Sequence, residues 1–168
     1  KIYLLVPEAT DICLPGCELI SITNIQSTEA MKAIASHSNG TYTLLYTKHT
    51  ELKLGLFALE RMVQIMEMTQ AGMVYADRYQ QVNGIRKAAP VIDYQFGSLR
   101  DDFDFGSVML FQSEVFRKMV KATKEDYQYA GLYDLRLKIS QKKKLVHINE
   151  YLYTEIENDT RKSGEKQF

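Results

Sequence analysis

The segment Thr47–Glu51, "TKHTE", is the first place in the chain where polar side chains are spaced for chemistry. In an extended segment His49 and Glu51 point to the same side, so together they could hold Mn²⁺. The alternative is a solvated polar loop between the strand predicted before it and the helix predicted after it. The pattern therefore leaves a metal site and a plain connection both open.

A second candidate is the acidic and aromatic segment that follows Arg100. It contains, in order, Asp101, Asp102, Phe103, Asp104, Phe105 and Gly106. Carboxylates this close repel one another unless cations or hydrogen-bond donors attend them. Aromatic rings beside acids are also common in sugar-binding sites, where ring faces stack and acids bind hydroxyls. The segment predicts a carbohydrate or cation site, and neutralisation by Arg100 is the alternative.

Three further acids follow predicted strands. Glu8 and Asp11 come after the apolar run Ile2–Val6, and Asp77 ends the run "MVYAD". Ligands of open α/β sheets bind outside the carboxyl ends of the strands, so these acids are candidates for ligand contacts. Solvated loop acids, and for Asp77 a turn acid beside Arg78, are the alternatives. His37 and His147 receive no role.

The totals limit the class of protein. The chain has 168 residues, 21 Lys plus Arg and 21 Asp plus Glu, so no net field attracts nucleic acid or an anionic membrane. No apolar run approaches the ~20 residues of a membrane span. Cys13 and Cys17 lack zinc-site spacing, which favours ordinary reduced thiols and a cytoplasmic protein.

The elements that must position these residues alternate between strands and helices. Strands are predicted at Ile2–Val6, 19–22, Tyr42–Tyr46, 73–77 and 107–111, and around Asn149-Glu150. Helices are predicted from Ser27 to about Ser36, from Leu56 to Gly72, at 113–121 and at 132–141. Asn83-Gly84 predicts a hairpin. The order indicates an α/β fold with a mostly parallel first half and an antiparallel second half.

Several segments resemble family 2 glycosyltransferases, which have the GT-A fold. "IYLLVPEATD" resembles that family's strand leading into acidic residues, and "DFGSVMLFQSEVFRKM" resembles its Gly-strand-helix segment near the acceptor site. "AGLYDLRLKISQKKKLVHINEYLYTE" is similar to its Glu-Asp-x-Asp-Leu helix and the strand that follows. The resemblance implies a domain at 1–154 whose first strand lies upstream of Lys1, and a polar tail or linker at 155–168 within a longer polypeptide.

The resemblance implies inverting transfer from a nucleotide-sugar to the hydroxyl of a carbohydrate or other acceptor. Such transfer needs a cation, Mn²⁺ or Mg²⁺, for the diphosphate and a carboxylate base. The family's Asp-x-Asp positions fall on Thr47–Glu51, where Lys48 could neutralise the diphosphate instead. Glu8 and Asp11 would bind the nucleotide, and Asp77, Asp101, Asp104 and Gly106 the sugar or acceptor.

The base position also departs from the family pattern. Gly131 and Leu132 replace its acidic pair, which leaves Asp134, together with Asp102, as the candidate catalytic carboxylates. Asp134 could instead pair with Lys138 one helical turn on. The alternative to an enzyme is a catalytically degenerate domain that binds carbohydrate or supports assembly. Metal-dependent nucleotide binding would separate the two.

Overall fold

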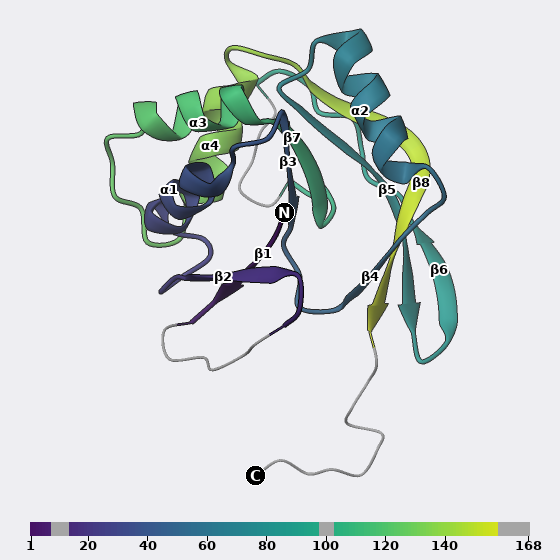
Figure 1. The fold of residues 1–168 in the computed structure, drawn as a ribbon. Helices are drawn as coiled ribbons and strands as arrows, with labels where there is room; N and C mark the ends of the chain where they lie inside the picture. Colours follow the sequence, from purple (N-terminus) through teal and green to yellow (C-terminus); the bar gives the residue numbers. More distant parts are fainter. Residues whose placement is uncertain (8–13, 98–102, 158–168) are drawn as a thin grey trace. The chain divides into compact units, whose positions relative to one another are not determined.

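The computed structural model describes residues 1–7, 14–97 and 103–157, and it divides into two compact units (Figure 1). Unit 1 comprises Lys1–Thr43 and Phe111–Lys143, and unit 2 comprises Leu44–Leu110 and Lys144–Phe168. Two of the three divisions fall inside strands, β3 (Tyr42–Tyr46) and β7 (Val108–Gln112), and the third lies at 143/144. Glu8, Asp11, Asp101 and Asp102 lie outside the described residues, as does Cys13.

Unit 1 contains a two-stranded parallel sheet and three helices. The strands β1 (Ile2–Val6) and β2 (Cys17–Ser21) pair in register. The helices are α1 (Thr28–His37), α3 (Ser113–Ala122) and α4 (Gly131–Ser140), and each contacts the other two. Their buried apolar faces include Met31, Phe116, Leu135 and Ile139. Ser27 caps α1 as predicted, because its Oγ accepts a hydrogen bond from Ala30 N at 3.1 Å.

Unit 2 is built on long neighbouring strands. In β5 (Met73–Val82), Met73 to Ala76 have no exposed surface, because β8 (Leu145–Glu157) pairs with β5 in parallel and α2 (Ala58–Thr69) packs against both strands. On the far side of β8 lies β4 (Glu51–Leu54), which is antiparallel to it. The antiparallel hairpin partner of β5 is β6 (Ile85–Ala89), which Figure 1 shows beside it.

The six strands run in the order β3-β7-β5-β8-β4, with β6 added to β5. This confirms the general α/β class. The sheet is mixed: β5 and β8 are parallel, whereas β4 and β6 pair antiparallel with their neighbours. The first two strands form a separate sheet rather than extending this one.

Two predicted boundaries were wrong. The segment expected to be a polar loop up to Glu51 gives way to the strand β4 before the helix, and α2 begins at Ala58. Leu56, expected on the buried face of that helix, therefore precedes it and is 87% exposed. The predicted end at Gly72 also shifts, because Gln70 adopts the left-handed conformation that ends α2.

The strand β5 does not end at Asp77. It continues to Val82, and β8 continues beside it to Glu157, three residues into the segment expected to be a polar tail. The register shifts where Ala76 pairs with Ile148 but Asp77 pairs with Tyr151, so Asn149 and Glu150 are left between these pairs. Such an irregularity changes the face of the sheet to which the following side chains of β8 point.

Candidate functional site

A buried carboxylate, Glu155, is the centre of the candidate site in unit 2. It lies on β8 and has no exposed surface. Its Oε2 is 2.7 Å from Lys48 Nζ, and its Oε1 accepts a hydrogen bond of 2.5 Å from Ser107 Oγ. Arg78 Nε lies 3.0 Å from the same Oε1. Two cations and one hydroxyl therefore compensate a charge that burial would otherwise strongly disfavour.

Arg78 connects this carboxylate to Asp104. Its side chain is 9% exposed, and its Nη2 donates to Asp104 Oδ2 at 3.0 Å. The contact from Nε to Glu155 is an ion pair without hydrogen-bond alignment, and Nη1 has no hydrogen-bond partner among residues 1–7, 14–97 and 103–157. Burial alone would lower the pKa of Arg78, but Asp104 and Glu155 outweigh it and raise the pKa. The guanidinium stays charged and retains unused donor capacity.

The carboxylate of Asp104 is fixed in orientation although it is 59% exposed. Oδ2 accepts from Arg78, and Oδ1 accepts from Gly106 N at 2.7 Å. A solvent-facing carboxylate held through both oxygens keeps lone pairs for further donors, such as the hydroxyls of a ligand. Asp104 is the predicted sugar-binding acid that the structure positions most clearly.

Gly106 has a structural reason to be glycine. Its φ is +72°, and a Cβ there would collide with the hydroxyl oxygen of Tyr153. That hydroxyl accepts hydrogen bonds from Ser107 N at 3.0 Å and Val108 N at 3.3 Å. The same missing Cβ would lie 3.6 Å from Arg78 Nη1, the donor without a partner. Gly106 therefore lets the chain approach Tyr153 and Arg78 closely.

Lys48, the predicted nucleotide-binding cation, contacts two glutamates of β8. Its Nζ lies 2.7 Å from Glu155 Oε2 and 3.3 Å from Glu157 Oε1. Burial alone would lower the pKa of Lys48, but the hydrogen bonds and charges of both glutamates outweigh it and raise the pKa. The positive charge of Lys48 is therefore balanced by these two glutamates.

Asp77 belongs to a second polar group, in which a histidine bridges two aspartates. Asp77 is 1% exposed; its Oδ1 accepts from Val91 N at 2.9 Å and lies 2.8 Å from His147 Nε2. His147 Nδ1 lies 2.6 Å from Asp93 Oδ1. A neutral imidazole donates through only one nitrogen, so both contacts are hydrogen bonds only when the group holds one additional proton.

Sequence reasoning gave His147 no role, and no signal in the sequence connects it to Asp77. The two residues are 70 positions apart and meet because β5 and β8 are neighbours. Tyr75 reinforces the group: its ring stacks on His147 at 5.2 Å, and its hydroxyl accepts from Tyr94 N and donates to Ile92 O. The segment 91–94 is therefore fastened to the sheet by buried polar side chains.

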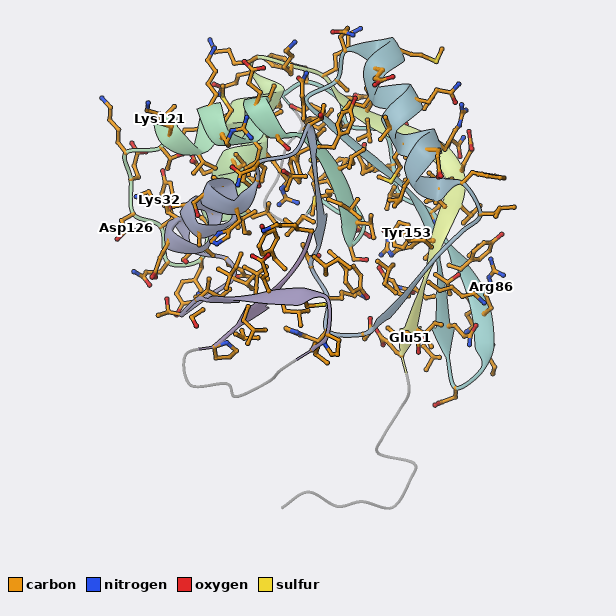
Figure 2. The ribbon with its side chains drawn as sticks, viewed as in Figure 1. Lys32, Glu51, Arg86, Lys121, Asp126 and Tyr153 are labelled. Atoms are coloured by element: carbon orange, nitrogen blue, oxygen red, sulfur yellow. The ribbon has the colours of Figure 1, made fainter. Side chains whose placement is uncertain are left out.

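The candidate metal ligands His49 and Glu51 are both exposed. His49 lies in the short bend before β4, and Glu51 is the first residue of that strand, paired with Ile156 (Figure 2). Within the part of the chain that the structure describes, no three His, Cys, Asp or Glu side chains are grouped to hold a metal ion.

Asp134 lies in unit 1, on α4, and is engaged by its neighbours. It forms a short ion pair with Lys138 and accepts a hydrogen bond from Thr123 Oγ1 at 3.1 Å. Lys138 also donates to Thr123 Oγ1 at 2.9 Å. These contacts correspond to the pairing alternative of the sequence analysis.

Gly131 packs closely against the start of α1. Its N donates to Gln26 O at 2.7 Å, and a Cβ there would lie 2.5 Å from the carbonyl carbon and oxygen of Ser27. Because those are backbone atoms at the start of α1, no side chain fits at 131 without moving a helix. The acid that the family pattern would place here is excluded by this packing.

Comparison with protein-family models gives no match to the chain. Comparison with curated proteins gives no match either. No helix in the described residues is both long and apolar enough to cross a membrane.

Proposed function

We propose that this chain is a glycosyltransferase-type protein that binds a nucleotide-sugar and transfers the sugar, with inversion, to an acceptor hydroxyl. The observation that carries the proposal is a convergence within unit 2. The predicted residues Lys48 and Asp104 come from two separate segments of the sequence; Lys48 contacts Glu155 on β8, and Asp104, held also by Gly106 of its own segment, contacts Arg78 on β5. Asp77, a fourth predicted residue, precedes Arg78 on the same strand.

In this proposal Asp104 accepts hydrogen bonds from hydroxyls of the sugar or acceptor. Arg78 Nη2 and Gly106 N donate to that carboxylate and hold it in place. Asp102, two residues before Asp104 in the sequence and outside the described residues, is the proposed base that takes the proton of the acceptor hydroxyl.

A cation, Mn²⁺ or Mg²⁺, would stabilise the diphosphate leaving group in such a transfer. The exposed pair His49 and Glu51 supplies two ligands that suit Mn²⁺ better than Mg²⁺, because one is an imidazole. Two ligands form a weaker site than three, so transfer with protein cations in place of the metal is part of the same proposal.

The second candidate function is a GT-A-like domain that binds carbohydrate without transferring it. The engagement of Lys48, Asp77 and Asp134 by other protein groups favours it. Side chains held in ion pairs and buried hydrogen bonds stabilise the fold and are less available to a reacting substrate. Product formation separates this function from the first.

The test is thermal unfolding of the whole chain with UDP-, GDP- and TDP-sugars, with and without Mn²⁺. A ligand at about ten times its Kd stabilises by ~1.4 kcal/mol, which for a chain of this size raises the midpoint by about 3–5 °C. We expect a rise that Asp104→Asn abolishes and that Asp126→Asn preserves. Asp126 is an exposed acid of unit 1, labelled in Figure 2. No rise with any nucleotide-sugar would overturn the proposal.

Release of the nucleoside diphosphate is then measured for each sugar that binds. Turnover supports the transferase. Binding without turnover over a range of sugar and polyol acceptors supports the carbohydrate-binding domain. The dependence of turnover on Mn²⁺ and its loss in His49→Ala would assign the metal role to the exposed pair.

A further inference from the structure

A hollow of about 310 Å³ lies on the sheet of unit 2, and it is lined by residues from β4, β5, β6 and β8. Its polar and aromatic lining comprises Lys53, Tyr79, Gln81, Arg86, Tyr151, Tyr153 and Thr154. None of these residues was selected from the sequence. Because four strands contribute, the hollow forms only when the register of the whole sheet is correct.

Strand register explains why these side chains share one face. Gln81 pairs directly with Arg86 across the β5–β6 hairpin, and Tyr79 pairs with Thr154 on β8. Lys53 on β4 pairs with the same Thr154. Directly paired residues of neighbouring strands project to the same side of a sheet, and residues two apart on one strand do so too. The alternation of β5 therefore separates Tyr79 and Gln81 from Arg78, which serves the buried Glu155.

Arg86 is held in an ordered stack. The guanidinium carbon of Arg86 lies 3.5 Å from the ring centroid of Tyr79, which in turn stacks on Tyr151 with centroids 4.6 Å apart and planes 25° from parallel. Figure 2 labels Arg86 on the outer strand of the hairpin. Stacking occupies a face of the guanidinium but leaves its N–H groups, which lie in the plane, directed outward.

The charge of this lining is one-sided. The residues that line the hollow include the cations Arg86 and Lys53 and no carboxylate; the nearest acid by register is Glu51, which pairs with the lining residue Ile156. No carboxylate of the described residues forms an ion pair with either cation, whereas Lys48, Arg61 and Lys138 all have acidic partners. Arg86 on β6 and Lys53 on β4 line the hollow from strands that are separated by β5 and β8. A planar guanidinium together with a flexible ammonium suits a phosphate group, which accepts several hydrogen bonds and carries more than one negative charge.

The uncharged part of the lining fits a sugar. Tyr151 is 40% exposed and offers an apolar ring surface, while Gln81 and Thr154 offer donors and acceptors for hydroxyls. Tyr153 lines the hollow and also bonds Ser107, which in turn donates to Glu155. Tyr153 therefore links the lining of the hollow to Glu155 through Ser107.

We propose that this hollow binds the phosphate group of a phosphorylated sugar, with Arg86 and Lys53 as its ligands and Tyr151 against the sugar ring. The inference rests on the proposed function where the phosphate belongs to a nucleotide-sugar. In that case Arg86 and Lys53 do what the sequence analysis assigned to Lys48. A free sugar phosphate presents the same chemistry, and the experiment distinguishes the two sources.

The test measures binding of pyrophosphate, glucose 1-phosphate and UDP-glucose to the whole chain by calorimetry at low ionic strength. We expect pyrophosphate to bind, and Arg86→Gln and Lys53→Gln each to weaken it about tenfold, the effect of losing one charge-assisted hydrogen bond. Lys87→Gln is the matched control: Lys87 is an exposed cation next to Arg86 that pairs with Gln80, so it belongs to the other face. It should change the affinity less than twofold.

The inference is overturned if pyrophosphate fails to bind, or if Arg86→Gln and Lys53→Gln bind it as the parent does. Midpoints of thermal unfolding without ligand, equal to the parent's, show that these variants fold. UDP-glucose binding that is insensitive to Arg86→Gln would leave the proposed function standing and remove this inference. Binding of pyrophosphate and glucose 1-phosphate through Arg86, with no nucleotide-sugar bound, would keep this inference and remove the proposed function.

Discussion

Lys48 Nζ lies 2.7 Å from Oε2 of Glu155, a carboxylate without exposed surface that is 107 residues further along the chain. The cation that the sequence offered for a ligand thus balances a charge inside the sheet. Ser107 and Arg78 complete the surroundings of that charge. The stability of unit 2 and the orientation of Asp104 therefore depend on the same group of side chains.

Glu155→Gln should destabilise the protein by about 3 kcal/mol. The substitution keeps the shape of the side chain but removes the charge that compensates Arg78 and Lys48, and breaking a buried ion pair on one side typically costs ~3–5 kcal/mol. Denaturant unfolding followed by circular dichroism measures the effect. Glu157→Gln, which removes the exposed partner of Lys48, should stay within about 0.5 kcal/mol of the parent. Equal effects for the two variants would contradict a structural role for the buried carboxylate.

Gly131→Ala tests the packing of α4 against the start of α1. Helix propensity alone favours alanine over glycine by up to ~1 kcal/mol. We expect destabilisation of about 2 kcal/mol instead, because a Cβ would lie 2.5 Å from backbone atoms of Ser27. At Gly40 a Cβ would lie 3.6 Å from Tyr42 O, an ordinary contact, so Gly40→Ala is the control. The free energy of unfolding is measured by denaturant titration. A decrease in Gly131→Ala supports the steric contact with α1, and an increase supports helix propensity alone.

The elements of this protein follow from local patterns where those patterns are strong. Apolar runs gave β1, β3 and β7, and the cap at Ser27 gave the start of α1. The strand β4 was missed although "ELKL" alternates: Leu52 and Leu54 are half-buried, and Glu51 and Lys53 are exposed. A strand of four residues at the edge of a sheet contains only two apolar–polar alternations, which is too few to be recognised beside a long amphipathic helix.

The candidate site was only partly predictable, for a different reason. The predicted strand ended at Asp77, and the following "RYQQV" was assigned to a hairpin, whereas charged and amide side chains rarely occupy a strand that is buried on both faces. In the structure β5 continues through Asp77 and Arg78, whose charges are met by His147, Asp104 and Glu155 from distant segments. Such partners depend on which strands are neighbours, and a single sequence carries no record of that. The hollow around Arg86 escaped prediction in the same way.

Asp77→Ala should release the segment 91–94 from the sheet. Val91 N donates to the buried Oδ1 of Asp77, and removing this acceptor leaves a buried N–H without its partner. We expect the amide hydrogen of Val91 to exchange at least about tenfold faster, as measured by NMR. Asp93→Asn is the control, because Asp93 is 82% exposed and, among the described residues, its hydrogen bond is to the outer nitrogen of His147. Unchanged exchange in Asp77→Ala would show that the backbone around Val91 is held by other contacts.

High pH should destabilise the protein through its buried tyrosines and through Lys48. Burial raises the pKa of Tyr153 and of Tyr75 above their ordinary value of 10.0, and the hydrogen bond from Ser107 only partly offsets this for Tyr153. The pKa of Lys48 is also raised, by Glu155 and Glu157, against the effect of burial. A group whose pKa is higher in the folded state contributes stability that is complete below its unfolded pKa and disappears as the pH rises through the folded pKa. Stability should therefore be level from pH 7 to 9 and fall above about pH 10.

Absorbance of tyrosinate at 295 nm should show one set of tyrosines titrating near pH 10 and a second, delayed set that ionises as the protein unfolds. Tyr153→Phe should reduce the delayed amplitude. A single titration of all tyrosines near pH 10 in the folded protein would contradict the burial of these hydroxyls.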